Sequence, residues 1–274
     1  MRGTVFALFL VLAGCCELGQ AQAQTPVLLM ATTTSTEDTG LLPELAKAFQ
    51  ARTGIELRWV AVGTGKALEM GKACDADVLL VHAPGAERNF MDKGYGQSRR
   101  EVMYNDFVVL GPASDPAGLK GQDVVKAMST LAGKKAQFFS RGDNSGTHMA
   151  ELALWKAAGL PVPDREAWYV STGQGMLQTM SMAGERGGYC LADRGTFIKY
   201  EAGPQAKNLV ILVEGAKELR NQYSVITLNP NKCPLVKSDL AQTFADWLVS
   251  PPGQEAVASF SLLGKQLFFP NAGQ

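Results

Sequence analysis

Short apolar runs that alternate with amphipathic helical segments constrain the fold of this chain most strongly. Residues 27–31, 55–62 and 77–83 are rich in aliphatic and β-branched side chains, which favours strands. Each run is followed closely by a segment whose apolar positions have helical spacing. Strands and helices that alternate in this way are typical of βαβ units and a mainly parallel sheet. The sequence therefore predicts an α/β fold.

A second series of strands and helices begins after residue 106. Residues 107–111 form a predicted strand that leads into it, and the extended run at residues 223–228 leads back. Two such widely separated runs predict a double crossover between two lobes. We expect lobe one to contain residues 24–106 and 222–274, and lobe two residues 107–221. Each lobe is predicted to be a mainly parallel sheet flanked by helices, with the two crossover strands as hinges.

Capping residues and glycines predict the helix boundaries. Thr39 is the predicted N-cap of a helix over residues 40–52 that Gly54 ends, and Ser145 is the predicted N-cap of a helix that reaches residue 158. Further helices are expected near residues 66–72, 86–93, 124–131, 175–185, 239–249 and 253–260. Further strands are expected near residues 136–140, 168–171, 188–191 and 209–213.

The charge balance excludes several classes of partner. Lysine plus arginine and aspartate plus glutamate each number 26, so the formal net charge is zero. Broad binding to nucleic acid or to an anionic membrane needs a clustered basic surface, which nothing in the sequence indicates. A small anion can still be bound by a neutral protein, because backbone N–H groups and one cation suffice.

The N-terminal segment is predicted to be a signal peptide, residues 1–23. Arg2 supplies the positive start, residues 5–13 form an apolar run, and residues 21–23 offer a small-x-small cleavage site before Gln24. The alternative is lipoprotein processing, because residues 12–15 resemble a lipobox and would leave a lipid anchor at Cys15. Both interpretations predict export, and we expect a periplasmic protein.

The mature chain has an odd number of cysteines, namely Cys74, Cys190 and Cys233. At least one thiol therefore stays free or pairs between chains. The spacings match no zinc site. We favour the interpretation that these are small semi-buried apolar side chains, with one disulfide as the alternative.

Three polar stretches stand where predicted strands give way to helices. They cover residues 32–35, 63–65 and 141–147, two in lobe one and one in lobe two. Ligands of open α/β sheets bind outside the carboxyl ends of strands, where helix starts offer unpaired N–H groups and a positive dipole end. The pattern predicts an oxyanion held between the lobes. The expected oxyanion-binding residues are Thr32, Thr33, Thr34, Ser35, Thr64, Gly65, Arg141, Ser145, Gly146 and Thr147.

Arg141 is the central residue of this predicted site. A guanidinium can grip two anion oxygens at once, and Asp143 is close enough in sequence to hold it in place without contacting the anion. The alternative for each polar stretch is an ordinary cap or turn. Residues 63–66 are not part of a P-loop, because Val60 and Ala67 stand where that motif needs glycine and serine or threonine.

Two further strand-to-helix segments leave both interpretations open. Thr172 and Gln174 in residues 171–175 are either additional donors from lobe two or structural residues. The same alternatives apply to residues 193–196.

Catalytic chemistry is poorly supported by the sequence. His82 and His148 are the two histidines, and Asp143, Ser145 and His148 follow no known triad order. The nucleophile-elbow pattern and a metal-ligand cluster are both missing from the sequence. We therefore predict no catalytic residues, no metal ligands and no cofactor, with a secreted hydrolase that uses Ser145 as the weaker alternative.

Five segments together resemble bacterial tungstate-binding proteins of tungstate ABC importers. They are residues 31–41, which contain Thr-Thr-Thr-Ser, and residues 77–84, 141–148, 171–176 and 192–196. The likeness covers essentially the whole mature chain. It implies a type II periplasmic binding protein fold that closes on its anion by hinge motion. It also implies a monomer that delivers the anion to an ABC transporter permease.

The predicted ligand is tungstate, with molybdate as an alternative because the two ions are nearly the same size. Tungstate has no proton at neutral pH, so it needs donors and positive groups rather than a carboxylate acceptor. Phosphate or sulfate on the same fold is the further alternative, because the Arg-x-Asp-x-Ser-Gly-Thr pattern of residues 141–147 is shared with phosphate binders. We assign Asp143 to Arg141 and not to a protonated ligand.

Overall fold

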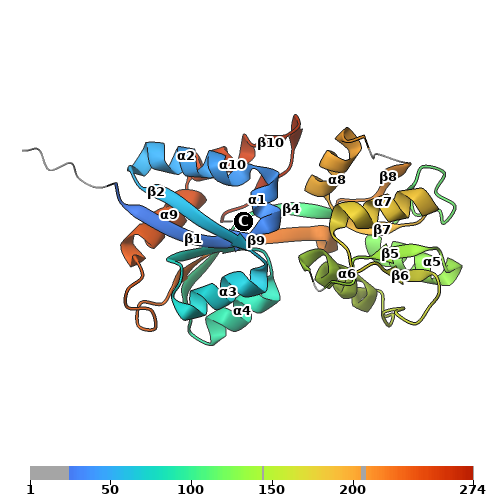
Figure 1. The fold of residues 1–274 in the computed structure, drawn as a ribbon, viewed down its shortest axis with the longest axis horizontal. Helices are drawn as coiled ribbons and strands as arrows, with labels where there is room; N and C mark the ends of the chain where they lie inside the picture. The colour runs from blue at the N-terminus through green and yellow to red at the C-terminus, as the bar shows by residue number, and fades with distance from the viewer. Residues whose placement is uncertain (1–24, 144, 205–207, 274) are drawn as a thin grey trace, which may run out of the picture.

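Two lobes joined by two long strands make up the molecule (Figure 1). The computed structural model describes residues 25–143, 145–204 and 208–273, so the predicted signal peptide and Cys15 lie outside the described residues. The joining strands are β4 (Gly96–Pro112) and β9 (Arg220–Leu228), which pair antiparallel from Gly96↔Leu228 to Asp106↔Arg220. None of the described helices is long and apolar enough to span a membrane.

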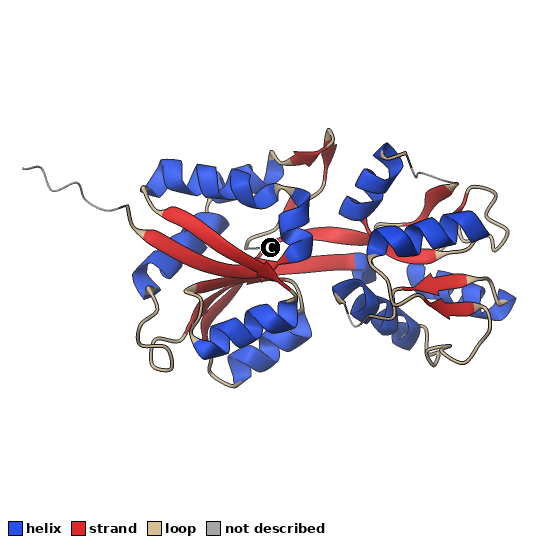
Figure 2. Cartoon of the chain, viewed as in Figure 1, coloured by secondary structure: helices blue, strands red, loops and turns tan. Residues whose placement is uncertain are grey.

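Lobe one is a sheet with helices on both faces (Figure 2). Successive residues of the parallel strands pack into different cores, for example Leu80 on one face and Leu79 on the other, which explains their unbroken apolar sequence. The strand order is β12-β4-β9-β3-β1-β2, with β1 (Val27–Thr33), β2 (Glu56–Val62), β3 (Val78–Val81) and β12 (Phe269–Pro270). The helices are α1 (Thr34–Thr39), α2 (Leu41–Thr53), α3 (Thr64–Ala73), α4 (Pro84–Asp92), α9 (Ser238–Val249) and α10 (Pro251–Ala258). The short strands β10 (Ser261–Leu262) and β11 (Lys265–Gln266) form a hairpin.

Lobe two is built around the second half of β4. The strands β7 (Cys190–Asp193) and β8 (Leu209–Val213) pair with it antiparallel, while β5 (Phe138–Ser140) and β6 (Tyr169–Ser171) pair parallel with each other. The helices are α5 (Val124–Lys134), α6 (Gly146–Ala157), α7 (Met176–Arg186), α8 (Arg194–Ala202) and the short η1 (Lys217–Leu219). Two apolar clusters, centred on Trp155 and on Met180, fill this lobe.

The α/β class is confirmed, and the sheets are mixed rather than mainly parallel throughout. The strands β2, β1 and β3 are parallel, as are β5 and β6. The crossover strands add antiparallel pairs, because one leaves lobe one and the other returns to it. The first half of β4 was not predicted, since charged residues such as Arg99 and Arg100 interrupt its apolar pattern.

Two local predictions near the N-terminus differ from the structure. A separate helix, α1, precedes α2, so Thr39 ends α1 and Gly40, with a φ of 86°, is the N-cap of α2. Left-handed backbone of this kind favours glycine. The prediction of Gly54 as the end of α2 and of Ser145 as the N-cap of α6 is confirmed.

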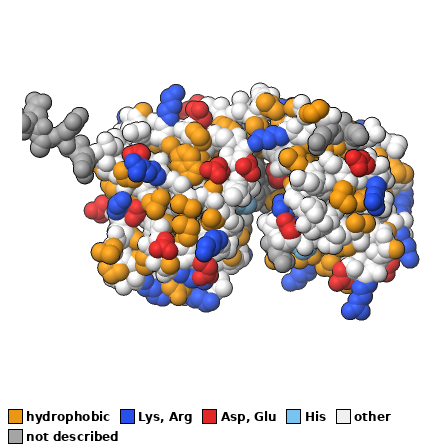
Figure 3. Space-filling view, in the orientation of Figure 1, with side chains coloured by type: hydrophobic (Ala, Val, Ile, Leu, Met, Phe, Trp, Pro, Cys, Tyr) orange, Lys and Arg blue, Asp and Glu red, His pale blue; other side chains and the backbone are white. Residues whose placement is uncertain are grey.

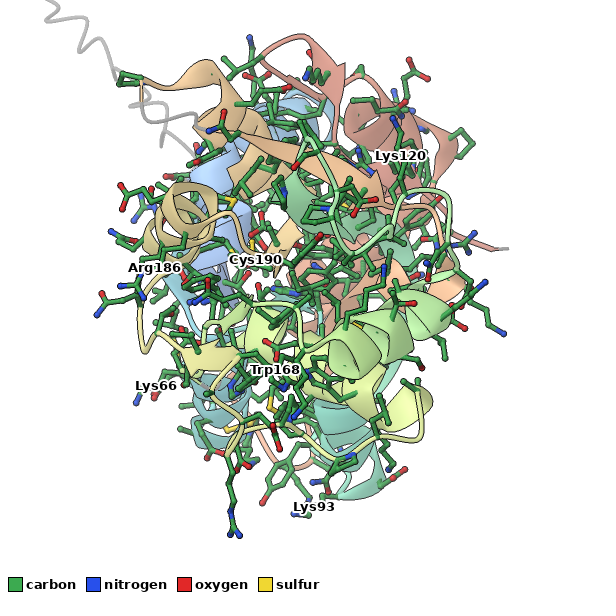
Figure 4. The ribbon with its side chains drawn as sticks, turned by 90° about the vertical axis from the view of Figure 1, so that its right-hand side faces the viewer. Lys66, Lys93, Lys120, Trp168, Arg186 and Cys190 are labelled. Carbon is green, nitrogen blue, oxygen red and sulfur yellow. A yellow bond between two sulfur atoms is a disulfide. The ribbon has the colours of Figure 1, made fainter. Side chains whose placement is uncertain are left out.

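A disulfide joins Cys74 at the end of α3 to Cys233 in the loop after β9, with their Cα atoms 5.4 Å apart. The favoured interpretation of these residues as small apolar side chains is therefore wrong, and the single-disulfide alternative is right. Cys190 is free and fully buried. Figure 4 shows it inside lobe two, whereas Arg186 lies at the periphery of the view. Burial raises the pKa of the Cys190 thiol well above its ordinary value.

We predict that replacing Cys74 and Cys233 together by alanine lowers the free energy of unfolding by about 2–5 kcal/mol. The cross-link joins residues 159 positions apart and so restricts the unfolded chain. Urea denaturation of the oxidised protein and the variant measures the difference. Equal midpoints would contradict the prediction, and Cys190 is expected to resist thiol reagents in both folded proteins.

Candidate functional site

The predicted polar segments of the two lobes meet in the hollow between them. A Cβ atom placed on Gly146, the first residue of α6 in lobe two, would lie 3.6 Å from Cε1 of His82 in lobe one. His82 directly follows β3, which pairs with β1, and β1 ends in the threonine segment. Figure 3 shows the surface hollowed between the lobes at its lower edge.

The threonine segment supplies the start of α1. Thr33 is the N-cap, and its hydroxyl accepts from the backbone N–H of Thr36 over 3.3 Å. Thr34 and Ser35 form the exposed first turn. The N–H groups of a first helical turn have no partner within the helix, so this turn can donate to an anion from both backbone and hydroxyl groups.

Thr32 does not fit the role predicted for it. Its side chain is fully buried, and its Oγ1 donates to the carbonyl oxygen of Leu80 over 2.8 Å, which joins β1 to β3. Side chains alternate along a strand, so Thr32 and Thr33, the last two residues of β1, cannot both face one ligand. Thr33 is also buried and directs its hydroxyl toward Thr36, 2.6 Å away. The exposed hydroxyls are those of Thr34 and Ser35.

The second predicted segment of lobe one begins α3. Gly63 is the N-cap, and Thr64 is the half-buried first residue of the helix. The preceding strand, β2, ends at Val62, whose partner in the parallel register is Thr33. The starts of α1 and α3 therefore follow neighbouring strand ends. Gly65 is exposed, and a Cβ there would meet nothing within 4 Å.

In lobe two, Arg141 and Asp143 form an ion pair at the start of α6. Both Nε and Nη2 of Arg141 donate to Oδ2 of Asp143, over 3.1 and 2.5 Å. The other oxygen of Asp143 accepts from the backbone N–H of Ser145 over 3.1 Å. Burial alone would raise the pKa of Asp143, but the hydrogen bonds from Ser145 and Arg141 lower it below its ordinary value. Asp143 is therefore ionised and orients the guanidinium.

The remaining residues of this segment open α6. Ser145 is the N-cap, and its hydroxyl oxygen accepts from the N–H of His148 over 3.3 Å, while the hydroxyl itself donates to the carboxylate of Asp143. Gly146 is exposed and Thr147 is buried. The hydroxyl of Ser145 is thus engaged in capping α6 and in binding Asp143, which is a structural role and not that of the activated nucleophile that a hydrolase would need.

Thr172 and Asp193, which belong to the two segments whose role was left open, make structural hydrogen bonds. Thr172 donates from Oγ1 to the carbonyl oxygen of Ser140 over 3.0 Å and tethers β6 to β5. Asp193 is the N-cap of α8 and accepts from the N–H of Thr196 over 2.8 Å. These bonds occupy the polar atoms that would otherwise make Thr172 and Asp193 candidates for a ligand.

His82 is a site residue that sequence reasoning missed. Its Nε2 lies 3.1 Å from Oγ1 of Thr33 and 3.3 Å from Oγ of Ser35. Its Nδ1 lies 2.9 Å from Oδ1 of Asn221, and its ring stacks on Tyr223 with centroids 4.5 Å apart. The available signal was position, because a polar residue at the end of a strand beside β1 must lie near the threonine segment.

The helix α8 contacts both lobes. Phe197 packs in a lobe-two core, whereas Ile198 belongs to the main core of lobe one. Glu201 forms an ion pair of 2.6 Å with Lys265 of the β10–β11 hairpin, and Lys199 donates to the carbonyl oxygen of Asp38. The structure therefore holds the lobes together through apolar and polar contacts of one helix.

The chemistry of the site is that of hydrogen-bond donors around one arginine. Over residues 25–143, 145–204 and 208–273, no group of His, Cys, Asp or Glu side chains is arranged to hold a metal ion. Hydroxyls, first-turn N–H groups and a guanidinium favour a ligand that is negatively charged and accepts hydrogen bonds from several sides.

Comparison with known proteins gives consistent matches over most of the chain. The profile of the family described as PBP superfamily domain matches residues 20–252. The tungstate-binding protein TupA of Campylobacter jejuni is 47% identical over 239 residues, which cover 87% of this chain and 88% of that protein.

Two solved structures are similar as well. The tungstate binding protein TupA from Desulfovibrio alaskensis G20 is 59% identical, with a TM-score of 0.87, over 90% of this chain and 99% of that one. The structure described as the tungstate ABC transporter from Geobacter sulfurreducens is 45% identical, with a TM-score of 0.74, over 85% of this chain and 98% of that one.

We predict that Thr32→Val lowers the free energy of unfolding by about 1–3 kcal/mol, because it removes a buried hydrogen bond. Ser35→Ala serves as the matched hydroxyl deletion on the exposed turn and is expected to change stability by no more than about 0.5 kcal/mol. Urea denaturation measures both. Equal losses of unfolding free energy in the two variants would contradict the assignment of Thr32 to a structural role and of Ser35 to the exposed site.

Proposed function

The chain belongs to the PBP superfamily and, within it, to the TupA tungstate-binding proteins, and on this premise we propose that it captures tungstate between its two lobes and delivers it to the permease of an ABC importer. The observation that carries the proposal is the meeting of two helix starts from different lobes at His82, with hydroxyl and N–H donors on both sides. The protein binds and releases its ligand and is not an enzyme.

The donor set suits a dianion without a proton. The proposed contacts come from Thr34 and Ser35 on α1, from Thr64 and Gly65 on α3, and from the Arg141 segment of lobe two. Asp143 already accepts from Arg141 and from Ser145, and its pKa is lowered, so it is not placed to accept a proton from hydrogen phosphate. This favours tungstate, or molybdate of nearly the same size, over phosphate.

The lobe-two contacts combine charge with helix geometry. Arg141 is half-buried, which strengthens its attraction for an anion relative to bulk water. The N–H groups of Gly146 and Thr147, which follow the N-cap Ser145, lie at the positive end of α6. We propose that these groups complete the coordination once the lobes close.

We propose a periplasmic location, with residues 1–23 as the signal peptide and a lipid anchor at Cys15 as the alternative. The relatives' names describe tungstate binding and a tungstate ABC transporter, and an exported binding protein would capture tungstate for such a transporter. We further propose that the protein acts as a monomer, since each half of the site comes from a lobe of the same chain.

The proposed moving bodies are residues 24–106 with 222–274, and residues 107–221. The change of partner along β4 supports these boundaries, because Asp106 is the last residue paired with β9 and Phe107 is the first paired with β7. Opening would separate Ile198 and Glu201 of α8 from lobe one.

We predict that tungstate shifts the protein toward the closed arrangement, because both lobes donate contacts to it. Small-angle X-ray scattering of the free and the tungstate-saturated protein is expected to show a smaller radius of gyration with ligand. Identical profiles at saturation would contradict hinge closure, although tungstate binding itself could be intact.

Arg141→Gln is predicted to weaken tungstate binding at least tenfold, because charge-assisted hydrogen bonds contribute about 1.5–3 kcal/mol each. Arg58→Gln is the matched control, since Arg58 also pairs with a carboxylate two residues away, Glu56, and is exposed on β2. Isothermal titration calorimetry with tungstate, molybdate, phosphate and sulfate measures the affinities.

The outcomes separate the parts of the proposal. Equal affinity of Arg141→Gln and the wild type would remove Arg141 from the site. A preference of the wild type for phosphate would overturn the ligand but keep the class of protein. Binding of none of the four anions would overturn the proposed function.

A further inference from the structure

A series of side-chain hydrogen bonds connects His82, in the candidate site, to both crossover strands. Nδ1 of His82 lies 2.9 Å from Oδ1 of Asn221 on β9. Nδ2 of Asn221 donates to Oδ1 of Asn105 on β4 over 2.7 Å, and these asparagines are direct partners in the β4–β9 register. Nδ2 of Asn105 makes a longer contact of 3.5 Å with the hydroxyl of Tyr223.

These hydrogen bonds lie where the two strands leave lobe one. The next pair in the register, Asp106 and Arg220, is the last between β4 and β9, and β4 then pairs with β7. Asn105 and Asn221 are both buried, so their hydrogen bonds are made with other protein groups rather than with bulk water. His82 is thus tied to the point about which the lobes would turn.

On its other side, His82 is hydrogen-bonded to the start of α1. Nε2 of His82 lies 3.1 Å from Oγ1 of Thr33, and Oγ1 of Thr33 lies 2.6 Å from Oγ1 of Thr36. The side chain of Thr36 also hydrogen-bonds with Tyr223, on whose ring His82 stacks. Thr33, Thr36 and Tyr223 are all buried, so the α1 start and the hinge strands share one polar network.

The side-chain amides of Asn221 and Asn105 determine which groups around His82 donate and which accept. Asn221 uses its NH₂ group toward Asn105, so its carbonyl oxygen faces His82 and requires a proton on Nδ1. A neutral ring then has Nε2 as an acceptor, with one lone pair. Thr33 is the nearer of the two hydroxyls, and its hydrogen fills that lone pair when Thr36 donates to Thr33 over 2.6 Å. Ser35 Oγ also lies 3.1 Å from Oγ1 of Thr33, and in this arrangement its hydrogen is not needed by His82 and can serve a ligand.

We propose that His82, as the neutral Nδ1–H tautomer, is a positioning residue of the anion site that fixes the Thr33 hydroxyl, leaves the Ser35 hydroxyl to the oxyanion, and couples the site to the hinge through Asn221 and Asn105. The inference rests on the proposed tungstate site and adds how its lobe-one half is oriented. It gives Thr33 a different role from the anion contact that the sequence predicts.

The surroundings of His82 agree with a neutral ring. Burial lowers the pKa of His82 below its ordinary value, while the hydrogen bond to Asn221 and the charge of Asp193 oppose that shift. Asp193 caps α8 in lobe two, Tyr223 lies under the ring, and the start of α6 faces its Cε1 edge. The first residue of α6 is a glycine, so its side chain adds no charge there.

Nitrogen-15 NMR of histidine-labelled wild-type protein tests the tautomer without any variant of the site. The chain has two histidines, so His148→Gln assigns the two rings. We expect Nδ1 of His82 to be protonated and Nε2 to be unprotonated at pH 7, with and without tungstate. A proton on Nε2, alone or together with Nδ1, would overturn the proposal.

A double-mutant cycle in tungstate affinity tests the coupling. His82→Phe keeps a ring on Tyr223 but removes both nitrogens, and Asn221→Leu removes the amide at similar size. Each is expected to weaken binding about tenfold, and the double variant no more than either single one, because both break the same chain. Ser98→Ala is the control, since Ser98 bonds Thr227 across the same two strands far from the site, over 2.8 Å.

The results distinguish this inference from the proposed function. Wild-type affinity in Asn221→Leu, or additive losses in the double variant, would overturn the coupling while tungstate binding by the wild type stands. A loss of affinity in Ser98→Ala equal to that in Asn221→Leu would reduce the effect to general weakening of the strand pair and would also overturn it. A wild type that binds no tungstate would instead overturn the proposed function, whatever the tautomer.

Discussion

The antiparallel pairing of β4 with β9 is the constraint on which the rest of the structure depends. These strands carry the chain out of lobe one and back, and β4 continues into lobe two, where it pairs with β7 and β8. Because β4 changes partner between Asp106 and Phe107, each lobe adds its own strands to β4 and has its own main apolar core. A ligand site between them can therefore be assembled or taken apart with little change to either core, since Ile198 of α8 is the lobe-two residue that packs in the lobe-one core.

The hydrogen-bond donors and charges of the two lobes determine which class of ligand such a site can bind. Each lobe presents a helix start, where N–H groups lack helical partners, and lobe two adds Arg141. The carboxylate of Asp143 is committed to Arg141 and Ser145, which preserves the donor character of the surface. In the proposed arrangement His82 accepts the hydrogen of the Thr33 hydroxyl, so that the Ser35 hydroxyl can donate to the anion.

Local signals in the sequence predicted much of this arrangement. The Ser145 cap and the Arg141–Asp143 spacing are short-range features, and the structure has both. The first half of β4 was hidden, because charged residues such as Arg99 and Arg100, which form ion pairs with Glu87 and Asp246, interrupt its apolar pattern. The role of His82 was hidden for a different reason, since its partner Asn221 is 139 residues away and is brought close only by the β3–β9 pairing.

The position of the bound metal atom tests the central claim most directly. Crystals of the protein grown with tungstate, measured with X-rays at a tungsten absorption edge, would locate tungsten by its anomalous scattering. The account predicts a single strong peak between the first turn of α1, with Ser35, and the start of α6, with Arg141 beside it. A peak on the outer surface of either lobe, or no peak in protein saturated with tungstate, would contradict an oxyanion site between the lobes.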